Sequence, residues 1–312
     1  MNEDDNKLYE VQEMYYGFRD KFNYFQCNQC KCLQILAIPS GMSKYYPENY
    51  YSFNAIEERN NYLNFIIDAI KKRRNKYALL NQGGFWGNLI YRFFPNEIIG
   101  SMNYCQLTNE SRILDVGCGT GKLLYACADA GLKQLLGIDP YLKRDIVYDN
   151  GLLILRRFIY DLSGQWDLIM FHHSFEHISD PIETLCKVSK LLAPGGICLI
   201  RIPVVSSYAW EYYRENWYQL DAPRHFYLHS IESMEIIAKK TMLKLEKVIF
   251  DSCYLQFCIS ELYKRNIPHV EQTNKHFKKI FSKNDMRRYR RETRKLNLQN
   301  YGDQAAFYLR KE

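Results

Sequence analysis

The sequence predicts an α/β protein with a doubly wound, mostly parallel sheet of seven strands, preceded by an N-terminal extension of helical or irregular structure. Between residues 112 and about 205, aliphatic runs alternate with helical patterns, as in parallel strands joined by right-handed crossovers. The first run, ILDVGCGTG at 113–121, ends in an acid and three glycines, which is typical of a strand end that holds a ligand. Two more β-type runs near the C-terminus complete the sheet.

The predicted elements follow one another in a regular order. Strands are expected at RILDVG (112–117), QLLGIDP (134–140), LLILRRF (152–158), WDLIMFHH (166–173), ICLIRIPVV (197–205), LEKVIFDS (245–252) and QAAFYLRK (304–311). Helices are expected at KLLYACADAG (122–131), at DPIETLCKVSKLLAPGG (180–196) with Pro181 in its first turn, and at 230–241. Apolar residues at helical spacing predict another helix within 55–76, and they are Ile56, Leu63, Ile66, Ile67 and Ile70.

Composition and patterning divide the chain into an N-terminal extension, 1–100, and a ligand-binding domain, 101–312, with an aromatic insertion at 206–229. Of the 312 residues 47% are hydrophobic and 25% charged, which is ordinary for a globular protein. No run approaches the ~18–20 apolar residues of a membrane span, and the start, MNEDDNK, is unlike a secretory signal. Ten cysteines lie without a disulfide rhythm, so we expect a cytoplasmic protein.

The net charge of +7 is concentrated in one segment. Residues 275–295 hold ten Lys or Arg and two acids, which leaves the rest of the chain near neutrality. Such a run could follow a phosphate backbone, but a solvated helix face is the commoner cause. We therefore do not expect a nucleic-acid partner.

The glycine run indicates what the ligand contains. Asp139 follows Gly117 by 22 residues, the spacing at which a carboxylate accepts both hydroxyls of a ribose. The dinucleotide pattern is G-x-G-x-x-G, whereas this chain has G-x-G-x-G with Asp115 just before it. A carboxylate repels a pyrophosphate and attracts an ammonium. The pattern therefore favours a nucleoside with an amino-acid tail over a dinucleotide, and argues against a dehydrogenase.

At this point the chain resembles the class I S-adenosylmethionine-dependent methyltransferases, which share a Rossmann-like fold. ILDVGCGTG resembles their first motif, LLGIDP the acid motif of the second strand, WDLIMFHHSFEHISDP the fourth-strand motif, and KLLAPGGICLIRIP the segment before the fifth strand. WYQLDAPRHFYLHS resembles a segment of the group that acts in sugar and antibiotic pathways. Together these motifs cover about residues 110–250.

The resemblance implies S-adenosylmethionine as cofactor and assigns residues to each part of it. The methionine part would lie on Gly117, Cys118, Gly119 and Gly121, with Asp115 near the ammonium. The ribose would contact Asp139, with Pro140 and Tyr141 beside it, and the adenine would contact Phe158 and Ile159. The residues His172, His173 and Ser174 would lie below the sulfonium. Many relatives carry an acid after the third strand that bonds to the adenine amine. This chain has only Asp161 there, slightly further along the sequence than that acid.

Three motifs beyond the cofactor site leave alternatives open. His225, in DAPRHFY, is either the base for an acceptor hydroxyl or a structural residue of its loop. In HHSFEH, the residues His173, Glu176 and His177 have metal-ligand spacing, and some O-methyltransferases of quinone precursors carry a similar Glu/His cluster that can hold a divalent ion. Since His173 replaces the first Glu of that cluster, we expect no metal.

The N-terminal segment CNQCKC resembles half of a zinc ribbon. Cys27 and Cys30 form one C-x-x-C pair, but a closed zinc site needs four ligands. The following YYPENYYSF is either a lid on the acceptor side or core packing.

The sequence thus predicts a methyltransferase for a small-molecule acceptor, with a sugar or sugar-nucleotide favoured. An O-methyltransferase of a quinone-like phenol, an RNA methyltransferase and a catalytically silent cofactor-binding protein are the alternatives. The fourth strand ends in FHHSFEH rather than the Pro-Pro-Tyr type motif of base N-methylation, which argues against RNA.

Overall fold

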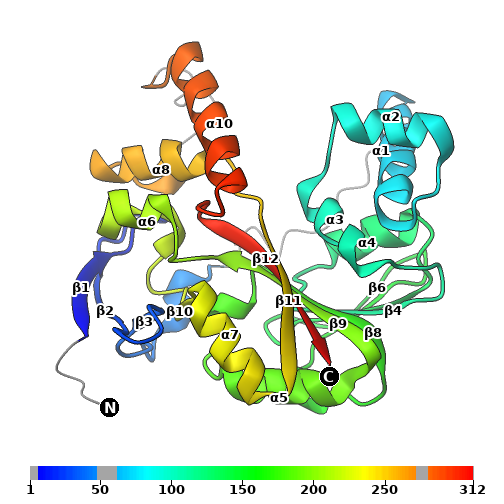
Figure 1. The fold of residues 1–312 in the computed structure, drawn as a ribbon, viewed down its shortest axis with the longest axis horizontal. Coiled ribbons are helices and arrows are strands. Elements are labelled where there is room, and N and C mark those ends of the chain that lie inside the picture. Colours follow the sequence, from blue (N-terminus) through cyan, green and yellow to red (C-terminus); the bar gives the residue numbers. More distant parts are fainter. Residues whose placement is uncertain (1–5, 48–61, 272–279, 312) are drawn as a thin grey trace.

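The structure, a computed structural model, describes residues 6–47, 62–271 and 280–311 of the chain (Figure 1). Ile56, the end of the YYPENYYSF run and the first lysines of the basic segment lie outside the described residues. No helix in the described ranges combines the length and the apolar character needed to cross a bilayer.

A large mixed sheet forms the centre of the molecule, in the order β11-β12-β9-β8-β4-β5-β7-β6. Its strands are β4 (Arg112–Val116), β5 (Gln134–Ile138), β6 (Ile146–Val147), β7 (Leu153–Leu155), β8 (Trp166–His172), β9 (Leu192–Pro203), β11 (Leu243–Phe250) and β12 (Gln304–Lys311). β7, β5, β4, β8 and β9 are parallel, while β12 runs antiparallel to both of its neighbours. The direction in which successive strands are added to the sheet reverses at β4. A ligand is therefore expected at the carboxyl end of β4, in a crevice beside β5 or β8.

The sheet has eight strands rather than the predicted seven. The additional strand is β6, two residues long, which pairs antiparallel with β7 at the edge. It lacks the alternating pattern of a longer strand, and its pairing is set by the turn at 148–152, where Tyr148 N–H donates to Leu152 O and Gly151 N–H to Tyr148 O. The other seven predicted strands are present.

Helices cover both faces of this sheet and make three layers (Figure 1). One face is covered by α5 (Pro181–Leu191) and α7 (Ile231–Lys240), and the other by α1 (Tyr62–Leu80), α3 (Glu97–Ser101) and α4 (Lys122–Asp129). The remaining helices are α2 (Gly84–Phe93), α6 (Tyr208–Tyr213), α8 (Leu255–Lys264) and α10 (Lys283–Leu298). The parallel strands are therefore buried on both sides, which explains their continuous aliphatic runs.

Helix α5 is shorter than the predicted 180–196. Asp180 caps it, since its carboxylate accepts from Glu183 N–H, and Pro181 occupies the first turn. The helix ends at Leu191, and β9 begins at Leu192. Pro194 disfavours helical backbone in the residue before it, so the chain is already extended there.

Three strands lie within residues 7–35, where a helical or irregular segment was predicted. β1 (Lys7–Gln12), β2 (Lys21–Gln26) and β3 (Leu33–Ile35) make an antiparallel sheet that β10 (Tyr227–Leu228) extends. Many Tyr and Asn residues obscure the alternation in this region. The sheet and the aromatic insertion share one core, which includes Tyr24, Trp210 and Trp217. The extension thus packs on the aromatic insertion rather than forming a separate unit.

Helix α1 differs from the prediction in the face that it buries. Ile66, Ile67 and Ile70 are exposed, whereas the sheet is contacted by the last turn, with Ala78 and Leu79 buried. Because α1 meets the core at its C-terminal end, the helical spacing of its earlier isoleucines does not identify the residues that are buried. The predicted helix is present as Tyr62–Leu80, but the isoleucines that indicated it are exposed.

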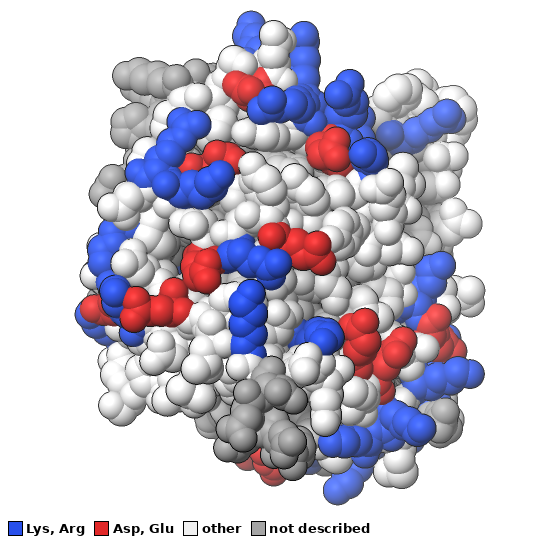
Figure 2. All heavy atoms as spheres, turned by 60° about the vertical axis from the view of Figure 1, so that its left-hand side comes forward, with Lys and Arg blue, Asp and Glu red and all other residues white. Residues whose placement is uncertain are grey.

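The described part of the basic segment is an amphipathic helix, α10. Tyr289 stacks on Phe257, and Thr293 and Leu296 are buried, so one face packs on the protein. The arginines lie on the outer face, at the top of the molecule, where acids interrupt them (Figure 2). This arrangement agrees with a solvated helix face.

A buried ion cluster joins the N-terminal sheet to the insertion. Arg224 has no exposed surface and binds Asp221 and, at 3.4 Å, Glu13. The carboxylate of Glu13 also accepts from the backbone N–H groups of Tyr16 and Phe18. Three charged groups in the interior are stable only while each has its partners.

Arg224→Ala is therefore expected to lower the free energy of unfolding by about 3–5 kcal/mol, because two buried carboxylates lose their counter-ion. Chemical denaturation monitored by circular dichroism measures this. The matched control is Arg112→Ala, at the exposed ion pair with Asp167, which should cost less than ~1 kcal/mol. Equal losses in both variants would contradict the role given to Arg224.

Candidate active site

The glycine loop after β4 is built from left-handed backbone, which glycine adopts without the steric cost of a Cβ. Gly117, Gly119 and Gly121 have φ of 72°, 55° and 78°, all left-handed. A Cβ on Gly117 would lie 2.5 Å from Ser174 Cβ, so this position also lacks space. Gly121 precedes α4, whose first N–H groups point toward the loop.

Asp139, at the end of β5, holds this loop in place. Its carboxylate accepts from Gly119 N–H at 3.0 Å and from Tyr141 N–H at 2.9 Å. Burial raises the pKa of Asp139, although these two bonds and the nearby His177 oppose the rise. The carboxylate thus lies at the carboxyl edge of the sheet, where the ribose was predicted.

Asp115 is the second buried acid of the loop. Burial, and then the charge of Asp139, raise its pKa to about 8. In the protein alone this carboxyl group therefore keeps its proton at neutral pH. A ligand that brings an ammonium group here would favour the ionised form, and the site matches the amino-acid part of S-adenosylmethionine in this respect.

The end of β8 lies directly against the loop. Ser174 Oγ donates to Val116 O at 2.6 Å and joins the ends of β8 and β4. His172 has both ring nitrogens buried without a hydrogen-bond partner in the described residues, and desolvation lowers its pKa. The backbone of His173 is left-handed, with φ of 52°, and its Nε2 lies 2.9 Å from Arg201 Nη1.

The residues predicted for the adenine and sugar side lie at the ends of β5 and β7. Ile159 is buried and Phe158 is about half exposed. The carboxylate of Asp161 accepts from Phe158 N–H, so it caps a turn rather than projecting freely. Tyr141, next to Pro140, is three-quarters exposed, and Tyr46 from the N-terminal segment stacks on it with ring centroids 6.5 Å apart.

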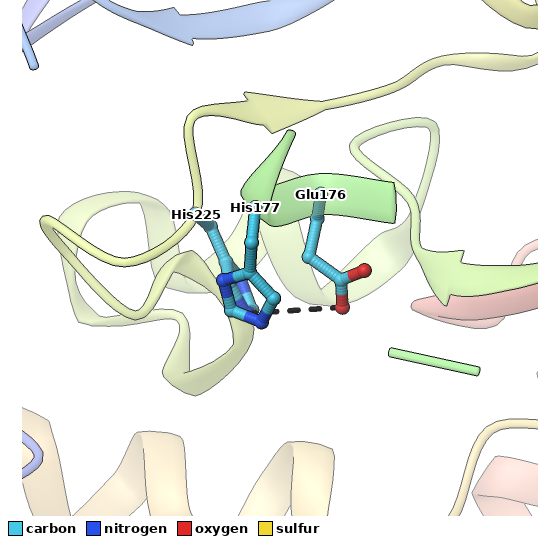
Figure 3. A group of neighbouring side chains, drawn as sticks. All are labelled: Glu176, His177 and His225. Carbon is cyan, nitrogen blue, oxygen red and sulfur yellow. Dashed lines mark ion pairs between the residues drawn. The ribbon is translucent and has the colours of Figure 1, made fainter. Parts of the chain in front are cut away.

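A cluster of two histidines and one carboxylate lies beside the loop (Figure 3). Glu176 and His177 belong to a short turn after β8, Phe175–His177, and His225 comes from the insertion. The two imidazole rings are in edge contact, with centroids 4.8 Å apart. His225 Nε2 lies 3.9 Å from Glu176 Oε1 and 3.7 Å from Asp221 Oδ2.

The protonation of this cluster follows from its burial. Desolvation lowers the pKa of His225 to about 4, against the attraction of Asp221 and Glu176, so the ring is neutral at pH 7. Burial alone would raise the pKa of Glu176, but His173 and the other two histidines hold it at about 2. A neutral imidazole beside an ionised, fully buried carboxylate is able to accept a proton.

Sequence reasoning missed the contacts between distant segments. It placed His173 rather than His225 with Glu176 and His177, because i, i+3 and i+4 spacing reveals only neighbours on one turn. Tyr46 belongs to the YYPENYYSF run, for which the sequence left a lid on the acceptor side and core packing open, and its hydroxyl lies 3.2 Å from His177 Nδ1. Gly137 was another omission, although a glycine inside a strand often marks close packing. A Cβ there would lie 2.6 Å from Cys118 Sγ.

Cys27 and Cys30 are free thiols in a tight turn, in which Lys31 N–H donates to Cys27 O. Cys32 is buried, with Sγ 3.9 Å from His229 Nδ1. Within the described ranges, Glu176, His177 and His225 are the only group of three or more metal-type side chains that come together. The described residues therefore assemble no zinc ribbon around these cysteines.

The fold and the site together define the domain of a class I S-adenosylmethionine-dependent methyltransferase, and S-adenosylmethionine is the cofactor that its buried acids and left-handed glycines fit. Residues 72–248 match the family described as "Methyltransferase domain". The match spans more than half of the chain, and the chain belongs to this family.

Individual curated relatives are similar to a part of the chain. A tRNA U34 carboxymethyltransferase of Alcanivorax borkumensis is 31% identical over 109 residues, which cover 30% of this chain and 33% of the relative. A ubiquinone biosynthesis O-methyltransferase of Psychrobacter arcticus is 29% identical over 101 residues, which cover 28% and 39%. The chain thus spans about a third of the length of the curated relatives that it matches.

Two solved structures are similar to parts of this chain. The cyclopropane synthase MmaA2 of Mycobacterium tuberculosis has a TM-score of 0.46 at 17% identity and covers 69% of this chain and 83% of its own. A SAM-dependent methyltransferase of Archaeoglobus fulgidus has a TM-score of 0.43 at 17% identity and covers 73% and 100%.

Asp139→Ala is expected to weaken S-adenosylhomocysteine binding by about 10- to 100-fold. The substitution removes a charge-assisted acceptor worth ~1.5–3 kcal/mol and releases the N–H of Gly119. Isothermal titration calorimetry measures the affinity. Asp149→Ala, an exposed acid in the turn after β6, is the matched control and should bind as the wild type does. Unchanged affinity in Asp139→Ala would place the ribose elsewhere.

Cofactor affinity is expected to rise as pH increases from 6 to 8, by up to about tenfold per unit. The reason is Asp115: its raised pKa of about 8 means that binding of an ammonium must first expel a proton. The rise ends near pH 8, where an α-amino group, with a pKa of ~7.7–8.0, loses its own charge. Titrations in two buffers of different ionisation enthalpy measure the released proton.

The Asp115 carboxyl group is expected to change the stability of the folded protein with pH in the opposite direction to cofactor affinity. Between pH ~4 and 8 the folded protein keeps a proton on Asp115 that the unfolded chain has lost, so this contribution to stability falls as pH rises. Asp115→Asn should remove both the proton release and this pH dependence. Binding without proton release in the wild type would contradict the assignment.

Proposed function

We propose that this protein transfers a methyl group from S-adenosylmethionine to a hydroxyl of a small-molecule acceptor, and that the acceptor is a sugar or sugar-nucleotide. The observation that carries the proposal is the position of the cluster Glu176, His177 and His225 beside the glycine loop. Ser174, two residues before Glu176, already contacts the end of β4. His177 is near enough to Asp139 to affect its pKa.

The chain's own residues supply alignment and a proton acceptor. As the acceptor oxygen forms its bond to the methyl carbon, the carbon–sulfur bond breaks, its electron pair stays on sulfur, and S-adenosylhomocysteine is released. The hydroxyl proton passes to the Nε2 of His225, where Glu176 and Asp221 stabilise the charge. Gln219 O accepts from His225 Nδ1 at 2.7 Å and keeps the ring in this orientation.

The sugar assignment is supported by where the resemblance falls. The segment WYQLDAPRHFYLHS, which resembles the sugar and antibiotic group, contains Asp221, Arg224 and His225. This segment meets Tyr46 at the cluster, since His177 Nδ1 lies 2.8 Å from Arg224 O and 3.2 Å from the hydroxyl of Tyr46. Aromatic rings of this kind stack on the apolar faces of sugars, and the tyrosine hydroxyl can bond to theirs.

Two other acceptors are compatible with the domain. The curated relatives include a ubiquinone biosynthesis O-methyltransferase and a tRNA enzyme, but each match covers less than a third of this chain. The acids along α10 and the inward packing of Tyr289 argue against an RNA surface there. A catalytically silent cofactor-binding protein would have no need of a proton acceptor at His225.

Methyl transfer from labelled S-adenosylmethionine to a panel of nucleotide sugars, catechols and short RNAs tests the proposal. Turnover is expected with a nucleotide sugar. His225→Gln, which keeps a donor for Gln219 O, should lower kcat by about 10²–10⁴-fold and leave cofactor affinity unchanged.

The matched control is His269→Gln, a histidine that stacks on Tyr15 outside the cluster. It should keep wild-type turnover. Exclusive turnover of a catechol or an RNA would overturn the sugar assignment. Cofactor binding without turnover of any acceptor class would favour the silent protein.

A further inference from the structure

The cluster beside the cofactor loop has the composition of a metal site. Three ligand atoms, one each from Glu176, His177 and His225, lie within 4.8 Å of one another. Figure 3 shows both rings turned toward the carboxylate, from two segments that are about 50 residues apart in the chain. The spacing in sequence could not reveal this group.

Each histidine is oriented by a backbone carbonyl behind it. His177 Nδ1 lies 2.8 Å from Arg224 O, and His225 Nδ1 lies 2.7 Å from Gln219 O. A carbonyl only accepts, so both Nδ1 atoms carry the hydrogen and donate it. The Nε2 atoms are then the ones available as ligands, and a carbonyl behind Nδ1 is the usual support of a metal-binding histidine.

The carboxylate between them lacks hydrogen bonds. Glu176 is fully buried, and neither of its oxygens has a hydrogen-bond partner among the described residues. Arg201 Nη1 only donates, so His173 Nε2 accepts and the hydrogen of this ring is on Nδ1, which lies 3.4 Å from Glu176 Oε1 and gives the carboxylate one long N–H contact. An ionised carboxylate with so little hydrogen bonding costs several kcal/mol in the interior, and a cation in contact with it removes that cost.

We propose that Glu176, His177 and His225 bind a divalent transition-metal ion of the Zn²⁺ class, with open coordination positions toward the acceptor. Two imidazole nitrogens and one carboxylate oxygen are a ligand set that suits such ions better than Mg²⁺ or Ca²⁺. Bonds of ~2.0–2.2 Å place ligand atoms ~3–4 Å apart. The side chains therefore need to close by only about 1 Å around the ion.

This set differs from the one that the sequence suggested. His173 does not take part, because its Nε2 faces Arg201. His225, which the sequence assigned to the acceptor hydroxyl, supplies the third ligand. The proposed metal site replaces our expectation from the sequence that the protein binds no metal.

The consequence for the acceptor rests on the proposed function. A hydroxyl bound at an open position loses its proton more readily, as water does on Zn²⁺, and the proton can leave to solvent. With an ion bound, His225 Nε2 would be a ligand and the proton would leave to solvent, whereas the transfer to His225 described above applies to the metal-free protein. Intermediate exposure of His177 leaves one side of the site accessible.

Cobalt titration of the full-length protein, stripped with a chelator and without acceptor, tests the site. One equivalent of Co²⁺ should give visible d–d bands without thiolate charge transfer, and Zn²⁺ should displace it. Glu176→Gln, His177→Gln and His225→Gln should each weaken binding at least ~10-fold, since loss of a supporting residue alone costs 10–100-fold. S-adenosylhomocysteine binding checks that each variant is folded.

Two controls separate this site from others. His269→Gln and the double variant Cys27→Ser, Cys30→Ser should bind Co²⁺ as the wild type does. The proposal fails if folded wild-type protein binds neither Co²⁺ nor Zn²⁺, or if the cysteine variant alone loses binding. Because occupancy is measured without turnover, a metal-loaded protein that methylates no acceptor would overturn the proposed function and leave the metal site standing.

Discussion

The approach of two strand ends, β4 and β8, fixes the geometry on which the site depends. Ser174 Oγ bonds to Val116 O, and Gly117 can lie against Ser174 only because it has no Cβ. This contact brings the turn that carries Glu176 and His177 next to the cofactor loop. Since the strands are parallel and central, neither end can move without disturbing the sheet. The cofactor site and the acceptor cluster are therefore one rigid unit.

Buried negative charge is the second feature that runs through the site. Asp115 and Asp139 lie under the loop, and Glu176 lies beside it, all nearly without exposed surface. The protein alone meets this cost in different ways. Asp115 stays protonated, Asp139 takes two backbone N–H groups, and Glu176 has only histidines around it. We propose that the first two acids bind an ammonium and a ribose, and that the third binds a cation.

The N-terminal sheet packs on the insertion that carries His225 instead of forming a separate unit. It shares a strand with the insertion, and Tyr24 donates to the carbonyl of His225 at 2.9 Å. Arg224, next in the chain, carries the ion cluster that anchors both parts. The position of His225 thus depends on residues that are about 200 positions away. This explains why a segment with weak patterning is needed to build the site.

The sequence by itself determined the parts that depend on local order. Seven strands, the glycine loop and the spacing from Gly117 to Asp139 follow from patterns within 30 residues, because strand periodicity and left-handed turns are local properties. Only the tertiary structure decided which histidine joins Glu176 and His177, which face of α1 is buried, and that the N-terminal residues are strands. Those features depend on contacts between distant segments, and side-chain spacing along a chain carries no information about them.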